Sequence, residues 1–324
     1  MKIISQKKKK QMKTKKMMKN KRFLKNKKQI GGKSQKQKQK QKFKKLQCSP
    51  KEKNKMNKFS CYTDEVLIKL RDLWNERHPD NIIKTNNTQE IHKILSDNLS
   101  SVCNKESCWL KQKFTQHKLD EQISDSFAPE SPGEWKKNPN EWLTSSDIIN
   151  VMKQYEKAYN CFDFIGPSPI DFDTKKMFGE CVWEELCNFN LAEQIKKGKT
   201  KIGMIFNTDP HNKPGEHWLS MFVNIKNGKI FFFDSVGNKI PNQIMVLVNR
   251  IIEQGQNLNP KINFSFDQNY PVEHQYKNTE CGIYSLYFVI HMLEDKITEH
   301  YLKTHILRDE YIEKFRKIYF NDDL

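Results

Sequence analysis

Residues 217–234 read HWLSMFVNIKNGKIFFFD, two apolar runs on either side of an Asn-Gly pair. Asn-Gly between apolar runs is a strong short-range signal for a β-hairpin, so the stretch predicts two antiparallel strands. His217 precedes the first strand and Asp234 ends the second, which places an imidazole and a carboxylate at one edge of the hairpin. A two-residue turn would pair Asp234 with Met221, so a bulge or a longer turn is needed to bring Asp234 near His217.

The segments on both sides of the hairpin mix helical and extended patterns. Apolar residues at helical spacing mark helices, short apolar runs mark strands, and the GPSP sequence at 166–169 predicts a loop. Because the strands and helices do not form regular βαβ units, the predicted fold class is α+β. The expected helices cover about 145–159, 175–190, 242–254, 281–293 and 309–320, and the expected strands outside the hairpin cover 201–207 and 261–266.

The charge of the 324-residue chain is concentrated at its N-terminus. The net charge is +18, but residues 1–60 hold 25 basic residues and one acid, against 32 bases and 38 acids in the rest. A mildly acidic body with a basic tail excludes a folded basic nucleic-acid-binding domain. Residues 1–58 have too few apolar side chains to offset chain entropy, so we expect a disordered tail. This tail has two alternative roles: a solvated arm, or a segment that binds nucleic acid electrostatically.

The remaining composition predicts three further regions. Apolar stripes that follow Thr63 and Asn87 indicate a small helical N-terminal domain over residues 59–125. Residues 126–139 are rich in Pro, Ser and Gly and are expected to form a linker. Residues 140–324 then form the main domain.

Membrane, secretory and metal-binding classes are disfavoured. The longest apolar run, 282–293, has 12 residues, too few to span a bilayer, and no signal peptide is expected. Cys103, Cys108 and His117 lack an obvious fourth ligand, so no metal is predicted. Without a secretory signal, all cysteines are expected to be reduced thiols. The eight cysteines are at positions 48, 61, 103, 108, 161, 181, 187 and 281.

Cys281 differs from the other cysteines because it begins the most apolar helix. A helix N-terminus stabilises a thiolate, and Gly282 would let a substrate backbone approach closely. Such a cysteine taken alone is more often structural, but His217 and Asp234 supply a base and its orienting acceptor. The amide of Gln275 and the Cys281 N–H would donate to an oxyanion.

The motifs His217-Trp218, Asp234-Ser235, Gln275 and Cys281-Gly282, in this order, resemble the adenain and SUMO-protease clan of cysteine peptidases. More narrowly, they resemble the polyprotein-processing thiol proteases of large DNA viruses, of the African swine fever virus and giant-virus type. The resemblance covers about residues 140–320. It implies a papain-like core with the catalytic segments in permuted order, so that 140–324 is the catalytic domain.

Residue roles follow from the same resemblance. It implies His217 as general base, Asp234 as its orienter, Cys281 as nucleophile and Gln275 as oxyanion donor. Asn238 is a rival to Asp234, because the third member of the triad varies within the clan. Trp142 and Trp218 are candidates, with Gln275, for the walls of a narrow substrate channel, and Trp218 is equally open to plain core packing.

The implied activity is cleavage of viral structural polyproteins or core proteins after Gly-Gly-type sites during virion maturation, through a thioester. Such an enzyme would need no cofactor and would reside in the virion and in the viral factory of the host cytoplasm. Its partners would be proteins with Gly-Gly motifs and, through residues 1–58, nucleic acid. A deconjugating isopeptidase for ubiquitin-like proteins, an acyltransferase and an inactive genome-binding scaffold are the alternatives. The Gly31-Gly32 pair also suggests the hypothesis that the enzyme cleaves its own tail after Gly32.

Overall fold

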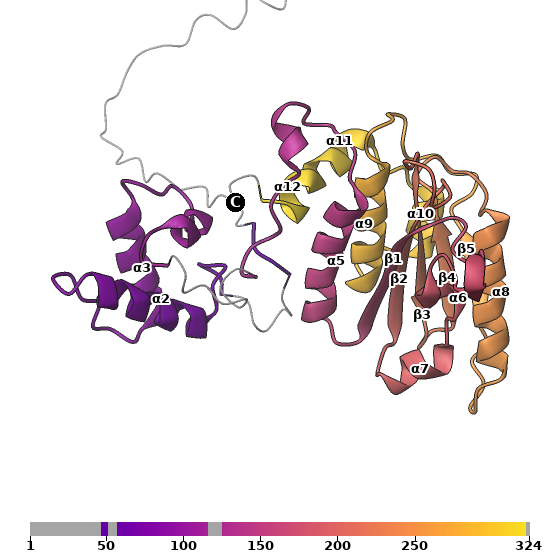
Figure 1. The fold of residues 1–324 in the computed structure, drawn as a ribbon, viewed down its shortest axis with the longest axis horizontal. Coiled ribbons are helices and arrows are strands. Elements are labelled where there is room, and N and C mark those ends of the chain that lie inside the picture. Colours follow the sequence, from indigo (N-terminus) through magenta and orange to yellow (C-terminus); the bar gives the residue numbers. More distant parts are fainter. Residues whose placement is uncertain (1–46, 51–56, 116–124, 322–324) are drawn as a thin grey trace, which may run out of the picture. The chain divides into compact units, whose positions relative to one another are not determined.

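A five-stranded sheet in the order β1-β2-β3-β4-β5 forms around the predicted hairpin (Figure 1). The computed structural model of the chain describes residues 47–50, 57–115 and 125–321. β1 and β2 are parallel, as are β4 and β5, and the inner pairs are antiparallel. This mixed sheet confirms the α+β class. The strands are β1 (Phe162–Pro169), β2 (Lys201–Asn207), β3 (Trp218–Asn224), β4 (Lys229–Phe233) and β5 (Ser265–Gln268).

Helices cover both faces of this sheet, with α5 and α9 on one side and α8 on the other (Figure 1). The α-helices are α2 (Asp64–Arg77), α3 (Thr88–Leu99), α5 (Ser145–Ala158), α6 (Glu184–Cys187), α7 (Leu191–Lys196), α8 (Asn242–Gln256), α9 (Cys281–Leu293), α10 (Glu299–Thr304), α11 (Asp309–Ile312) and α12 (Arg316–Tyr319). The 3₁₀ helices are η2 (Glu106–Lys111), η3 (Gly133–Lys136), η4 (Met177–Gly179) and η5 (Glu313–Phe315).

The central strands are mostly apolar and buried because their side chains enter two cores. In β4, Phe232 joins the cluster under α8, whereas Phe231 and Phe233 join the cluster under α9. A strand covered on both faces needs this continuous apolar run. Gly203 in β2 lets α9 lie close to the sheet, since a Cβ there would be 2.5 Å from Val289 Cγ1.

The hairpin has a longer turn than two residues, as its end residues require. Asn224 pairs with Lys229 and Ser220 pairs with Phe233, so residues 225–228 form the turn. Asp234 therefore follows the last paired residue of β4, at the end of the sheet where β3 begins.

Three local predictions are wrong. The expected helix over 175–190 is a β-bridged turn between Lys175 and Cys181, followed by the short α6. The GPSP loop is part of β1, which tolerates prolines because it lies at the edge of the sheet. The strand expected over 261–266 is β5, which lies further along the chain.

The region around α2 and α3 has a core of its own, as the helical pattern predicts. Thr63 caps α2 by accepting from the Val66 N–H, and Asn87 caps α3 by accepting from the Glu90 N–H. Its buried apolar residues include Tyr62, Leu67, Leu70, Trp74, Ile91, Leu95 and Trp109.

Residues in the expected tail and in the expected linker make contacts with other segments. Residues 47–50, assigned to the tail, are ordered: the Ser49 N–H donates to Ser126 O at 3.1 Å, and the Ala128 N–H to Gln47 O at 2.9 Å. Trp135, in the expected linker, is buried in the same cluster as α9, and its indole N–H donates to Glu141 O at 3.0 Å. The expected tail at 1–46 and 51–56 lies outside the described residues, so its disorder stays a prediction.

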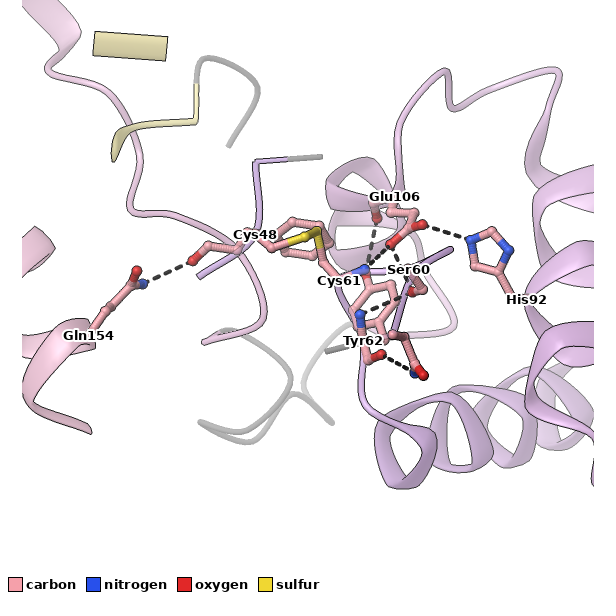
Figure 2. The surroundings of a disulfide bond; sticks show 9 residues. Cys48, Ser60, Cys61, Tyr62, His92, Glu106 and Gln154 are labelled. Carbon is pink, nitrogen blue, oxygen red and sulfur yellow. Dashed lines mark hydrogen bonds and ion pairs between the residues drawn. A yellow bond between two sulfur atoms is a disulfide. The ribbon is translucent and has the colours of Figure 1, made fainter. Parts of the chain in front are cut away.

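The expectation of reduced cysteines is wrong, because three pairs of cysteines form disulfides in the structure. Cys48 bonds Cys61 (Figure 2), Cys103 bonds Cys108, and Cys181 bonds Cys187. Their Cα–Cα distances of 5.0, 5.5 and 6.2 Å are within the usual range of a disulfide. Only Cys161 and Cys281 remain as free thiols among the described residues.

Two structural absences hold for the described part of the chain. In residues 47–50, 57–115 and 125–321, no helix is long and apolar enough to cross a bilayer. The same residues hold no group of three His, Cys, Asp or Glu that could hold a metal ion. Cys103 and Cys108, two of the three residues considered as zinc ligands, form a disulfide. The third, His117, lies outside the described residues.

Candidate active site

His217 and Asp234 lie close together at the end of the sheet where β3 begins and β4 ends. His217 Nε2 lies 2.7 Å from Asp234 Oδ1. The Asp234 side chain is 2% exposed and that of His217 is 19% exposed, so the carboxylate is shielded while the ring is still reachable from solvent. A buried carboxylate at this distance fixes the orientation of an imidazole.

A tight loop after β4 holds the Asp234 carboxylate. The Val236 N–H donates to Oδ1 at 3.1 Å, and the Asn238 N–H donates to Oδ2 at 3.2 Å. Gly237 has a φ of 75°, in the left-handed region that this turn requires. Asn238, the rival third member, thus supplies a backbone N–H to Asp234, and the ring of His217 is bonded by Asp234.

The surroundings of His217 favour its protonated form. Burial by itself would lower the pKa of His217, but hydrogen bonds to Asp234 and Cys281 outweigh burial and raise the pKa to about 9. Since Nε2 bonds Asp234, Nδ1 is the ring nitrogen left for the thiol of Cys281. An imidazolium next to a cysteine favours the thiolate, the nucleophilic form.

Cys281 is the first residue of α9 and is 2% exposed. The first turn of a helix has free backbone N–H groups and the positive end of the helix dipole, which suit a thiolate and an oxyanion. A Cβ on the neighbouring Gly282 would lie 3.0 Å from Leu143 Cβ and 3.2 Å from Trp218 Cδ1. Gly282 therefore permits close packing within the chain, rather than the substrate approach expected from the sequence.

Gln275 lies in the loop between β5 and α9 and is 3% exposed. Its Oε1 accepts from Ser235 Oγ at 2.7 Å, and one Nε2 hydrogen is donated to Lys277 O. A primary amide has two N–H donors, so one hydrogen remains for another acceptor. The neighbouring His274 is fully buried, and its Nδ1 accepts from the Leu307 N–H at 3.1 Å.

The two candidate wall residues differ in exposure. Trp142 is 37% exposed, whereas Trp218 is 7% exposed and donates from Nε1 to Leu143 O at 3.0 Å. Trp218 belongs to the core under α9, which agrees with the core-packing alternative. Trp142 offers an accessible indole one residue before Leu143.

Comparison with known proteins places this arrangement in a family. Residues 153–324, more than half of the chain, match the model of the Ulp1 protease family, C-terminal catalytic domain. The chain belongs to the Ulp1 family of cysteine proteases. This confirms the resemblance recognised in the motifs, and with it the assignment as a thiol protease.

Viral proteins are among the relatives of this Ulp1-family protease. A protein of Acanthamoeba polyphaga mimivirus that carries a thiol protease name is 26% identical over 294 residues, 85% of this chain and 93% of the mimivirus protein. A cysteine protease of African swine fever virus is 25% identical over 243 residues, 70% of this chain and 86% of the viral protein. The crystal structure of the African swine fever virus protease matches with a TM-score of 0.62 at 21% identity, over 85% of this chain and 95% of the other. This match confirms the fold.

The Ulp1-family site also uses polar residues that the sequence analysis did not single out. Asn269 bonds both backbone groups of Asp234, accepting from its N–H at 2.9 Å and donating to its carbonyl at 2.7 Å. Asp309 Oδ2 accepts from the N–H groups of Tyr276 and Lys277 and so holds the loop that carries Gln275. No sequence pattern marks Asn269 or Asp309, because both act through contacts between distant segments.

Proposed function

We propose that this chain is an endopeptidase that cleaves viral structural polyproteins or core proteins after Gly-Gly-type sites during virion maturation. The observation that carries the proposal is the hydrogen bond between His217 and the buried Asp234, with Cys281 close enough to raise the pKa of His217 and placed at the start of α9. The similarity of the chain to viral proteases supports a viral substrate.

In the proposed mechanism, Cys281 and His217 act as a thiolate–imidazolium pair. The Cys281 Sγ bonds to the carbonyl carbon of the substrate, and the oxyanion accepts from the Cys281 N–H and the second Nε2 hydrogen of Gln275. The C–N bond breaks as His217 gives its proton to the leaving amine, which leaves a thioester. Water then attacks with His217 taking its proton, and the C–S bond breaks to restore the thiolate.

Asp234 keeps His217 in the orientation and protonation state that both steps need. Its carboxylate accepts from the ring and from two backbone N–H groups, so its position is fixed while the imidazolium forms and decays. The roles of Cys281, His217, Asp234 and Gln275 are part of the same proposal. The proposal also places the enzyme in the virion and the viral factory, with residues 1–58 as an arm for nucleic acid.

Deconjugation of a ubiquitin-like protein is the second candidate function. Relatives from two African swine fever virus isolates, 25% and 24% identical, carry the name SUMO-1 cysteine protease. Conjugates of such proteins require the same thiolate, base and oxyanion donors, because they too are acyl-transfer substrates.

The test is a panel of Gly-Gly-X peptides beside a ubiquitin-like conjugate, with Cys281→Ala as the inactive control. Cleavage of peptides by the wild type alone supports the processing protease. Cleavage of the conjugate alone supports the deconjugating enzyme. An unchanged rate in Cys281→Ala would contradict both.

A further inference from the structure

Arg316 forms a buried ion pair with the residue directly before Cys281. Its side chain is 6% exposed and that of Glu280 is fully buried. Arg316 Nε lies 2.9 Å from Glu280 Oε2, and Nη2 lies 3.0 Å from Oε1, a bidentate contact. Because Glu280 is the N-cap residue of α9, this guanidinium is anchored to the start of the helix that begins with Cys281.

The same guanidinium bonds the segment that carries Trp142. Arg316 Nη1 donates to Glu141 O at 2.8 Å, and Nη2 donates to Thr279 O at 3.1 Å. One planar group therefore joins the backbone just before Trp142 to the backbone just before Cys281. Only an arginine has enough donors in a fixed plane to make these contacts together.

Both sides of Trp142 are held. The Trp135 Nε1–H also donates to Glu141 O at 3.0 Å, and the Trp135 ring lies 4.5 Å from the guanidinium carbon of Arg316. On the other side, Leu143 O accepts from Trp218. The exposed indole of Trp142 thus extends from a backbone fixed at the residue before it and the residue after it.

Stability does not account for this cluster. Burying two charges costs solvation, so a buried ion pair contributes little more than an apolar pair of the same volume. What the cluster supplies is geometry and charge. Arg316 neutralises the carboxylate of Glu280, which would otherwise repel a thiolate on Cys281.

We propose that Arg316 is a positioning residue that fixes the exposed indole of Trp142 relative to Cys281, so that the indole contacts a bound peptide. The inference rests on the proposed protease function. Arg316 touches no substrate and acts through the segment that carries Trp142, so a substitution that keeps its positive charge but removes its backbone contacts weakens peptide binding rather than the reactivity of the thiol.

The decisive variant is Arg316→Lys, which keeps the charge opposite Glu280 but loses donors to Glu141 and Thr279. The KM for a Gly-Gly-X peptide is expected to rise about 5- to 10-fold, the size of one or two lost hydrogen bonds. The kcat and the rate of alkylation of Cys281 by iodoacetamide stay within about twofold. A fall in kcat or alkylation with KM unchanged would overturn the proposal.

A double-mutant cycle with Trp142→Ala tests whether Arg316 acts through the indole. Once Trp142 is removed, Arg316→Lys should raise KM by no more than about twofold, because coupled residues are not additive. Arg250→Lys is the matched control: Arg250 also bonds a carboxylate, Asp173, and a carbonyl, Leu186 O, but far along the chain from Trp142. Additive effects, or an equal rise in KM in Arg250→Lys, would refute the proposed role.

Two further measurements keep the test decisive. If Arg316→Lys does not fold, Trp135→Phe removes the other donor to Glu141 O, and the same selective rise in KM is expected; an unchanged KM there counts against the proposal. Peptide Kd is measured with Cys281→Ala, since binding needs no turnover. A wild type that cuts no peptide speaks against the proposed function, whereas an active wild type with unchanged Kd in Arg316→Lys/Cys281→Ala speaks against the role of Arg316.

Discussion

The hydroxyl of Ser235 donates to Oε1 of Gln275 at 2.7 Å, and both side chains are buried. The two residues lie on different segments. This bond turns the oxygen of the Gln275 amide toward Ser235 and so fixes the direction in which the NH2 group points. The Ser235 carbonyl also accepts from the backbone N–H groups of His274 and Gln275, each at 2.8 Å. The residue after Asp234 therefore orients the proposed oxyanion donor.

Ser235→Ala is expected to lower kcat about tenfold with little change in KM, because the amide of Gln275 becomes free to rotate away from the oxyanion. Steady-state kinetics on a Gly-Gly-X peptide measure the effect. Gln275→Ala sets the upper limit, at about 100-fold in kcat. The double variant should be no worse than Gln275→Ala, and an additive loss would show that Ser235 acts elsewhere.

Asp234→Asn is expected to reduce kcat by about 10³- to 10⁴-fold, because the neutral amide no longer stabilises the imidazolium and its NH2 group can hold the wrong tautomer of the imidazole. It should also move the alkaline limb of the pH profile. In the wild type, activity is expected to fall as pH rises through about 9, where His217 loses its proton. Without the carboxylate the pKa of His217 falls, so the alkaline limb of kcat/KM shifts to lower pH. An unmoved limb would contradict the assigned role.

His274 is expected to make the fold sensitive to acid. Burial lowers the pKa of His274 to about 4, below the usual value near 6.5. The unfolded chain therefore binds a proton first, and stability falls as pH drops from about 6.5 to about 4, by about 3 kcal/mol. His274→Gln, which keeps an acceptor for the Leu307 N–H, should lose this slope in urea unfolding measured across pH. The raised pKa of His217 acts in a separate window, with stability lost as pH rises from about 6.5 to about 9.

The disulfides predict a thiol count. Titration of the denatured, non-reduced chain with a thiol reagent should give two free thiols, Cys161 and Cys281, and eight after reduction. Opening Cys48–Cys61 with Cys48→Ser and Cys61→Ser should cost about 2–3 kcal/mol, because the bond closes a loop in the unfolded chain. A count of eight without reduction would restore the reading of reduced thiols.

Local sequence signals predicted the elements that carry the site. The Asn-Gly turn, the apolar runs of β3 and β4 and the apolar stretch after Cys281 each needed only neighbouring residues to be recognised. The order of His217, Asp234, Gln275 and Cys281 then allowed the family to be recognised. The errors arose where tertiary contacts override local preference, as in β1, whose prolines suit an edge strand, and in residues 47–50, which pair with a distant segment.

The sequence by itself therefore determined the fold class, the protease family and the residues proposed for catalysis, because these depend on periodicity and on motif order. Only the tertiary structure decided how those residues are held: by Asn269, Asp309 and Arg316. Each bonds a segment at least 32 residues away in the chain. No local pattern encodes such bonds, since a single buried polar side chain satisfies its partners only after the whole core has formed.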